Sequence, residues 1–276
     1  MILRSPPAAV PRSEADLVRR IAGRGRALVA LSGGVDSSLV AALAFEALGS
    51  QSIAVTLAGP AVARSEVDRA REVARSIGIE HVVVDIDPLA RAEYRSNTPN
   101  RCYFCRTVET EALLREGAAR AVAQYLDGVQ VDDLSDDRPG LRAMDEAGFD
   151  HPLVWAGWRK RDVRDTANHR RLPNWDQPSD ACLSSRVTHG DAISLELLSR
   201  IEAGETWLLG RGFRRVRLRT GGGGARIEVD PEEVARLSTE PLASEARAAI
   251  GRLGFAPVVI DPLGYAGARA RRETAA

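Results

Sequence analysis

The residues in this 276-residue chain with the greatest chemical potential are its three cysteines. Cys102 and Cys105 lie in the string NRCYFCR with two residues between them, and Cys182 lies far along the chain in ACLSSR. Cysteines at the first spacing are typical of a redox pair, a zinc site or an iron–sulfur site. Each cysteine also has an arginine close to it in the sequence, which favours the thiolate form that such chemistry requires: Arg101, Arg106 and Arg186.

The residues by themselves leave several uses of these cysteines open. A CxxC pair at the start of a helix is typical of thioredoxin-like redox chemistry. Zinc would need a fourth ligand, for which His151, His169 and His189 are candidates. An iron–sulfur site is the third use that the cysteine spacing allows.

A second candidate site is the polar loop in ALVALSGGVDSS, which follows a short apolar run. It places glycines, serines and one acid at the start of the next helix: Ser32, Gly33, Gly34, Asp36, Ser37 and Ser38. Glycines let the backbone approach an anion, while free amides and the helix dipole favour negative charge. The Walker string G-x-x-x-x-G-K-[ST] does not occur in this chain. A tight turn capped by serine or aspartate is the simpler alternative.

SGG-x-DS after a strand resembles the signature of the PP-loop ATP pyrophosphatases. Enzymes with this loop split ATP into AMP and pyrophosphate and adenylate a carbonyl or carboxyl oxygen of their substrate. The resemblance implies that the loop holds the departing pyrophosphate. It also implies that Asp36 helps to hold Mg²⁺, a hard cation that prefers oxygen ligands. We therefore expect ATP and Mg²⁺ as cofactors.

The apolar pattern predicts an α/β scaffold for these sites. Predicted strands lie at residues 26–31, 52–58, 81–87 and 125–131, and predicted helices at 37–49, 65–78 and 107–124. Such alternation predicts a parallel sheet with helices on both faces. Ligands of these sheets bind beyond the carboxyl ends of the strands, where the SGGVDSS loop lies.

The second half of the chain has a different pattern. A polar helix is predicted at 159–171, and a long irregular segment follows at 172–190. Loops of this length are usually functional or disordered. Beyond it we expect helices at 193–209, 231–237 and 242–252, strands at 213–219, 225–229 and 256–260, and a glycine turn at 221–224. We predict a PP-loop domain at residues 13–186 and a smaller α+β domain at 190–265 for substrate binding or oligomerisation.

Composition and charge narrow the class of partner. The chain has 38 Lys and Arg against 38 Asp and Glu, so a zero net charge indicates neither a nucleic-acid nor a membrane partner. No apolar stretch approaches the roughly 20 residues of a membrane helix, and no secretory signal is visible. Three cysteines are too few for a disulfide framework and fit a reducing cytoplasm. We expect a cytoplasmic homo-oligomer that acts on a small molecule.

Six strings in this order closely resemble the LarE family, the ATP-dependent sulfur transferases of nickel-pincer cofactor synthesis. They are NTPNRCYFCR (97–106), DGVQVDDLSDDRPG (127–140), HPLVWAGWRKRDVR (151–164), DQPSDACLSSR (176–186), RIEAGE (200–205) and ARIEV (225–229). The resemblance spans about residues 13 to 265. It implies adenylation of a carboxylate of pyridinium-3,5-biscarboxylic acid mononucleotide, delivery of sulfur to give a thiocarboxylate, and a repeat on the second carboxylate.

The resemblance implies one of two sulfur sources. In one kind of family member, a single cysteine in the CLSSR-like string gives up its own sulfur and becomes dehydroalanine. In the other kind, three cysteines hold a 4Fe-4S cluster that carries an extra sulfide. Cys102, Cys105 and Cys182 match the second kind, and an iron without a protein ligand is a natural place for sulfide. We predict the cluster route, with a sacrificial Cys182 as the alternative.

The resemblance also implies contacts with the nucleotide. Asp132 and Asp133 match a paired-acid position of the family and are predicted to contact ATP, although a helix N-cap explains one of them equally well. Lys160 and Arg164 lie one helical turn apart, and they either clamp phosphates or are solvated.

For the other substrate, the resemblance implies residues from the later strings. Ser185 and Arg186 are predicted to hold its phosphate, because an arginine fork suits phosphate oxygens. Glu202, Arg217 and Arg226 match family positions near the substrate, and surface salt bridges are the alternative for each.

Other functions predict different features. A PP-loop amidotransferase would not need three placed cysteines, and we expect no glutaminase domain in this chain. A tRNA thiolase would predict a basic surface and an RNA-binding module, which the zero net charge does not support. A non-catalytic nucleotide-binding module would leave the cysteines without a purpose.

Overall fold

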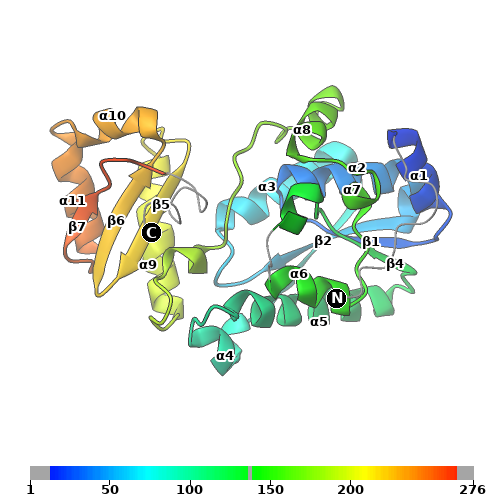
Figure 1. Cartoon of the computed structure of the whole chain (residues 1–276), viewed down its shortest axis with the longest axis horizontal. Coiled ribbons are helices and arrows are strands. Elements are labelled where there is room, and N and C mark those ends of the chain that lie inside the picture. The colour runs from blue at the N-terminus through cyan, green and yellow to red at the C-terminus, as the bar shows by residue number, and fades with distance from the viewer. Residues whose placement is uncertain (1–12, 136–138, 266–276) are drawn as a thin grey trace. The chain divides into compact units, whose positions relative to one another are not determined.

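The computed structural model describes residues 13–135 and 139–265 and divides the chain into two compact units (Figure 1). The first unit contains the chain up to Tyr94 together with Asn100–Asp180. The second contains Arg95–Pro99 and the chain from Ala181 onward. This division places Cys182, Ser185 and Arg186 in the second unit, whereas the sequence grouped them with the PP-loop domain.

The first unit is built on a four-stranded parallel sheet in the order β3-β2-β1-β4. Its strands are β1 (Ala27–Ala30), β2 (Ser52–Ala58), β3 (Glu80–Asp85) and β4 (Gln124–Leu126). The predicted α/β class with a parallel sheet is confirmed. Strand β4 is shorter than the predicted 125–131, because the chain turns at Asp127, whose carboxylate accepts a hydrogen bond from the Val129 amide.

Helices cover both faces of this sheet (Figure 1). They are α1 (Glu14–Ala22), α2 (Val35–Leu48), α3 (Arg64–Ile77), α5 (Arg101–Ala119), α6 (Pro139–Glu146), α7 (Pro152–Trp155) and α8 (Lys160–His169). A further short helix, α4 (Ala92–Arg95), precedes α5 in the chain. The face with α1, α2, α3, α7 and α8 holds the larger apolar core, and α5 and α6 cover the opposite face.

Strand β1 shows why both faces must be covered. Side chains alternate along a strand, so Ala27 and Val29 join the larger core, whereas Leu28 joins the smaller one with Leu113 of α5. All three β1 residues are fully buried. Burial of a leucine or valine side chain contributes roughly 1.5–3 kcal/mol. The helices on each face therefore stabilise the strand that leads into the phosphate loop.

Helix α5 begins earlier than predicted and contains the cysteine pair. The sequence predicted a helix at 107–124, after the cysteines, but α5 spans Arg101–Ala119. The Asn100 carbonyl accepts hydrogen bonds from the Tyr103 and Phe104 amides at 2.9 and 3.4 Å, which starts the helix ahead of the cysteines. The helix ends before Ala121, whose positive φ of 52° is incompatible with a right-handed helix.

The second unit is a small α+β structure around a three-stranded sheet in the order β5-β6-β7. Its strands are β5 (Val216–Gly221), β6 (Gly224–Val229) and β7 (Val258–Ile260), and its helices are α9 (Leu195–Leu209), α10 (Val234–Ser238) and α11 (Leu242–Arg252). β5 and β6 form an antiparallel hairpin. The turn at Gly222 and Gly223 has φ values of +57° and +82°, which glycine adopts without strain.

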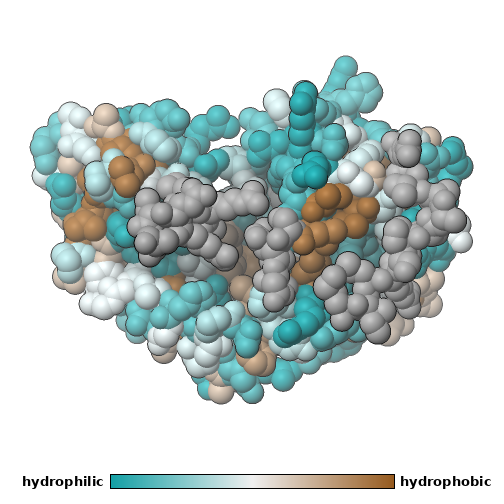
Figure 2. All heavy atoms as spheres, in the orientation of Figure 1, coloured by the Kyte–Doolittle hydropathy of each residue, from teal (hydrophilic) through white to brown (hydrophobic). Residues whose placement is uncertain are grey.

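The visible surface is mostly hydrophilic (Figure 2). Among the described residues the large exposed hydrophobic side chains are Trp175, Leu195, Leu209, Val259 and Leu263. Within the described ranges, no helix combines the length and apolar character needed to cross a membrane.

Candidate active site

The loop between β1 and α2 is closed by its own serines. The Ser37 hydroxyl accepts the Ser32 amide at 3.1 Å and lies 3.1 Å from the Gly34 carbonyl oxygen, to which it donates. The Ser38 hydroxyl donates to the same carbonyl at 2.8 Å. Helix α2 begins at Val35, two residues earlier than predicted, so that Asp36 lies in its first turn. The first amides of a helix lack intrahelical partners, which makes this loop an anion cradle.

Gly33 lets this loop pack tightly against α3. Its φ is +79°, and a Cβ at this position would lie 2.8 Å from the carbonyl oxygen of Glu66 and 3.1 Å from the amide nitrogen of Ala70. Both the left-handed conformation and the close approach exclude a larger residue. Close contact with the backbone of α3 therefore requires glycine at position 33.

Asp36 has the surroundings expected of a magnesium ligand. Its Oδ2 lies 2.5 Å from Lys160 Nζ, while its Oδ1 is buried without a hydrogen-bond partner among the described residues. Burial raises the pKa of Asp36, and the positive charge of Lys160 opposes that rise. A buried carboxylate oxygen without a donor beside a phosphate cradle suits a hard cation. The residues present therefore fit Mg²⁺.

Helix α8 brings two cations to the phosphate loop. Lys160, at the start of α8, forms the ion pair with Asp36. Arg164, one turn further, donates to the Gln177 carbonyl at 3.2 Å, and its charge also acts on Asp36. Lys160 is therefore paired with Asp36 and is not simply solvated. A role of the two cations in clamping phosphates stays a prediction.

Asp132 holds α8 in this position. Its Oδ2 accepts the backbone amide of Lys160 at 3.0 Å, and its Oδ1 accepts Arg159 Nη1 at 2.8 Å. Asp132 thus caps α8, a helix far along the chain. Asp133 accepts the Gln130 amide at 3.2 Å within its own turn. Nucleotide contacts of the two acids stay a prediction.

A buried charged cluster lies at the end of β4, and sequence reasoning did not find it. His151 Nδ1 lies 2.7 Å from Asp127 Oδ1, and His151 Nε2 lies 2.8 Å from Asp145 Oδ1. Burial disfavours the imidazolium, but the two carboxylates outweigh it and raise the pKa of His151 to about 9. Both ring nitrogens are therefore engaged, so His151 is unsuitable as the fourth ligand of the zinc alternative.

Cys102 and Cys105 lie in the first two turns of α5, on one face of the helix. Cys102 is exposed, and the Arg101 guanidinium lies 4.0 Å from its Sγ. The Cys105 thiol donates to Glu109 Oε1 at 3.3 Å. Glu109 also forms an ion pair with Arg106, so this carboxylate is shared between the cysteine and the arginine.

Cys182 precedes a short 3-10 turn, Leu183–Arg186, in the second unit. The Arg186 side chain is only 3% exposed, and its Nη1 donates to the Cys182 carbonyl at 3.1 Å and to the Ser185 hydroxyl at 3.0 Å. The other edge of the guanidinium binds both oxygens of Glu205, at 2.8 and 2.9 Å. The arginine fork predicted for a phosphate thus holds the Cys182 turn against α9.

Glu205 is a residue that sequence reasoning missed in RIEAGE, where Glu202 was singled out. Glu205 is buried, and it accepts the Leu218 amide at 2.8 Å as well as Arg186. Glu202 is half-buried on the same helix. The signal that distinguishes them is helical spacing, because Glu205 follows the buried Leu198 and Ile201 at intervals of three and four.

The β5–β6 hairpin gathers an arginine cluster, defined as Arg217, Arg219 and Arg226, around Glu228. Glu228 is fully buried, and it lies 3.3 Å from both Arg219 and Arg226. Register places Arg217 opposite Glu228 and Arg219 opposite Arg226. Arg219 also donates to the Ser185 carbonyl at 2.7 Å. Two predicted substrate residues, Arg217 and Arg226, thus share this hairpin, and Arg219 ties it to Ser185.

The cysteines do not form a complete metal site within either unit. Cys102 and Cys105 belong to the first unit, and Cys182 belongs to the second. In the part of the chain that the structure describes, no three His, Cys, Asp or Glu side chains are grouped to hold a metal. Three soft thiols nonetheless suit iron–sulfur chemistry as a donor set. The cluster therefore stays a prediction.

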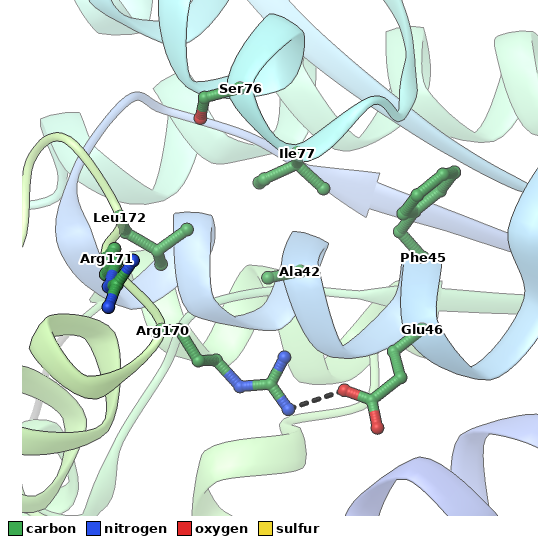
Figure 3. A pocket seen from close by; sticks show the side chains of 8 residues that line it. All are labelled: Ala42, Phe45, Glu46, Ser76, Ile77, Arg170, Arg171 and Leu172. Atoms are coloured by element: carbon green, nitrogen blue, oxygen red, sulfur yellow. Dashed lines mark hydrogen bonds and ion pairs between the residues drawn. The ribbon is translucent and has the colours of Figure 1, made fainter.

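A separate pocket of about 240 Å³ lies beside α2 and the end of α8 (Figure 3). Its lining residues are Ala42, Phe45, Glu46, Ser76, Ile77, Arg170, Arg171 and Leu172. None of them belongs to the phosphate loop, and Arg170 is held by Glu14 and Glu46. This pocket therefore does not contain the residues of the candidate phosphate site.

The parallel sheet, the SGG-x-DS loop and the Asp36–Lys160 pair define an ATP-using enzyme of the PP-loop class. In agreement, the NAD synthase family model matches residues 16–132. Over 247 residues the chain is 37% identical to an uncharacterised protein of Synechocystis sp., covering 90% of this chain and 92% of that protein.

Two further relatives carry functional names. The chain is 31% identical over 264 residues to the pyridinium-3,5-bisthiocarboxylic acid mononucleotide synthase of Lactiplantibacillus plantarum, covering 95% of each chain. It is 33% identical over 220 residues to the tRNA-specific 2-thiouridylase MnmA of Xanthobacter autotrophicus, covering 65% of this chain and 56% of that protein. This chain belongs to the LarE family and is an ATP-dependent sulfur transferase.

Proposed function

We propose that this enzyme adenylates the carboxylates of pyridinium-3,5-biscarboxylic acid mononucleotide and converts them to thiocarboxylates. The observation that carries the proposal is the 31% identity to the Lactiplantibacillus plantarum synthase across 95% of both chains. A relative of that name, matched over nearly its whole length, supports the same substrate class for both units of this chain.

In the first step, a substrate carboxylate oxygen attacks the α-phosphorus of ATP, and pyrophosphate leaves. The product is an acyl adenylate, in which AMP has become a good leaving group. The serine-closed loop and the start of α2 bind the pyrophosphate as it departs. Asp36 would hold Mg²⁺, which neutralises phosphate charge when bound. Lys160 adds a second positive charge on the same side.

In the second step, sulfur replaces AMP on the activated carbonyl carbon. Cys102, Cys105 and Cys182 would hold a 4Fe-4S cluster, which would supply the sulfide. In the alternative route, the Cys182 thiolate attacks the carbonyl, AMP leaves, and a thioester forms. Removal of the Cys182 α-proton then breaks the Cβ–S bond, releasing the thiocarboxylate and leaving dehydroalanine.

We assign the substrate phosphate to the neighbourhood of Ser185. The Ser185 hydroxyl contacts Arg186, and its carbonyl contacts Arg219 of the arginine cluster. Arg226 is 45% exposed and carries positive charge at the outer side of the cluster. In this assignment Arg186 acts by positioning the Cys182 turn, and Glu202 supplies a polar contact from α9.

The metal content of enzyme purified without oxygen tests the sulfur source. The cluster route predicts roughly four irons per chain and repeated turnover that is lost in Cys102→Ala and in Cys105→Ala. Full multiple-turnover activity in both variants would exclude the cluster. In that case, mass spectrometry should show loss of the sulfur of Cys182 after one turnover.

The substrate assignment has its own test. Incubation with MgATP and the pyridinium dicarboxylate mononucleotide should release AMP and pyrophosphate, and ADP should not form. The similarity to MnmA makes tRNA thiolation the second candidate. If AMP release requires tRNA and does not require the mononucleotide, the proposed substrate is wrong and tRNA thiolation is the function.

A further inference from the structure

We infer that Asn174 is a positioning residue for the phosphate loop, and that the segment carrying it, residues 172–180, responds to pyrophosphate binding. Asn174 lies in the irregular stretch between α8 and Cys182, yet its side chain is only 4% exposed. Its Nδ2 donates to the Gly33 carbonyl at 2.8 Å and to the Ser38 hydroxyl at 2.9 Å. One side chain therefore bridges the loop before α2 and the first turn of α2.

The Gly33 carbonyl determines which way the Asn174 amide faces. A carbonyl oxygen only accepts hydrogen bonds, so the NH₂ group of Asn174, and not its oxygen, must face the loop. The Asn174 oxygen is buried without a hydrogen-bond partner among the described residues. Asn174 thus occupies a position where its oxygen makes no hydrogen bond, which indicates that its role is donation to the loop.

This contact orients the peptide group between Gly33 and Gly34. In a trans peptide the carbonyl and the N–H point in opposite directions. Because Asn174 holds the carbonyl on its own side, the Gly34 amide must point to the opposite side, where it lies 3.3 Å from the Ser32 hydroxyl. A phosphate oxygen bound by the loop would be approached by this same amide. Asn174 therefore selects the loop conformation that offers the amide to an anion.

The same segment has two more attachments within the first unit. The Gln177 carbonyl accepts Arg164 of α8, and Asp180 forms an ion pair with Arg69 of α3 at 3.0 Å. Helix α3 is also the helix against which Gly33 packs. The segment thus contacts the loop and the two helices beside it, and the chain then continues into Ala181 and Cys182. A shift of the loop on binding pyrophosphate will move this segment.

Trp175 makes that movement measurable. It follows Asn174 directly and is 40% exposed, so its fluorescence is sensitive to a change of surroundings. Addition of pyrophosphate with Mg²⁺ to the intact enzyme should change the tryptophan emission, and Trp175→Phe should remove that change. The inference rests on ATP use by the PP-loop and is independent of the sulfur source in the proposed function.

Asn174→Asp tests the positioning role most sharply, because it replaces the donor with an acceptor of the same shape. We expect the affinity for pyrophosphate, measured by Trp175 emission, to fall about 10–100-fold. The KM for ATP in AMP formation should rise with it. Asn174→Ala should lose less, since it removes the donor without adding repulsion. Asn168→Asp makes the same chemical change at an exposed site on α8 and should behave as wild type.

Thermal unfolding separates positioning from a purely structural role. If Asn174→Asp lowers the melting temperature but binds pyrophosphate with wild-type affinity, the inference is wrong. It is equally wrong if pyrophosphate binds to the wild type without changing Trp175 emission. Pyrophosphate binding is measured without the pyridinium substrate, so failure of the proposed function would leave this result intact.

Discussion

The phosphate loop of the first unit and the Cys182 turn of the second unit are built in opposite ways. The loop is a run of neighbouring residues whose serines form most of its hydrogen bonds with one another, and Asn174 adds contacts from farther along the chain. The Cys182 turn is held by Arg186, whose partner Glu205 comes from another helix and is itself buried. A local motif tolerates loss of single contacts, whereas a buried ion pair leaves an uncompensated charge when one partner is removed.

The largest effect is therefore expected at Glu205. Glu205→Ala leaves the Arg186 guanidinium buried without its carboxylate, which should lower the free energy of unfolding by about 3–5 kcal/mol. Urea denaturation measures this change. Glu196→Ala, an exposed acid at the start of the same helix, should change stability by less than about 0.5 kcal/mol. Equal stability of the two variants would show that the Cys182 turn does not depend on the buried Arg186–Glu205 ion pair.

His151 tests whether the first unit also depends on buried charge. Its pKa is raised to about 9, above the roughly 6.5 of an unfolded histidine, so its protonation stabilises the fold fully below pH 6.5. That stabilisation, of order 3 kcal/mol, is lost as the pH rises through 9. We expect His151→Gln to remove most of this pH dependence from urea denaturation between pH 6.5 and 9.5. An unchanged pH profile would show that the Asp127 and Asp145 contacts do not hold the imidazolium.

Lys160→Met should affect activity more than stability. It removes the cation beside Asp36 and the phosphate loop, so AMP formation should fall about 10–100-fold. Release of pyrophosphate measures the rate. Arg161→Met is the matched control, because Arg161 is 90% exposed on the next position of α8. A similar loss in both variants would mean that overall charge, and not the Asp36 contact, matters.

The smallest effect is expected at Arg226. Its side chain is 45% exposed, and Glu228 keeps Arg219 as a partner when Arg226 is removed. Arg226→Ala should cost about 1 kcal/mol or less in stability, and added salt should reduce the difference. A loss as large as that of Glu205→Ala would show that Glu228 depends on both arginines. The KM for the mononucleotide, measured in parallel, tests whether the arginine cluster contacts the substrate phosphate.

Much of the first unit could be predicted from sequence, because its signals are local. The strand Ser52–Ala58 and the cap at Gly78 follow from apolar periodicity and from a glycine at a helix end. The phosphate loop was recognisable for the same reason, since glycines and serines that bind an anion must be neighbours. The start of α5 was missed because polar and cysteine residues carry no helical periodicity.

The amino-acid sequence by itself determined the α/β class, the phosphate loop, the spacing of Cys102 and Cys105, and the family resemblance. Tertiary structure alone decided which acid pairs with which arginine, as in Glu205 with Arg186, and that Asn174 reaches Gly33. Hydrogen bonds and ion pairs join side chains that are distant in sequence, and residue type alone does not specify the partner. Periodicity reports burial, but only packing of the folded chain selects these contacts.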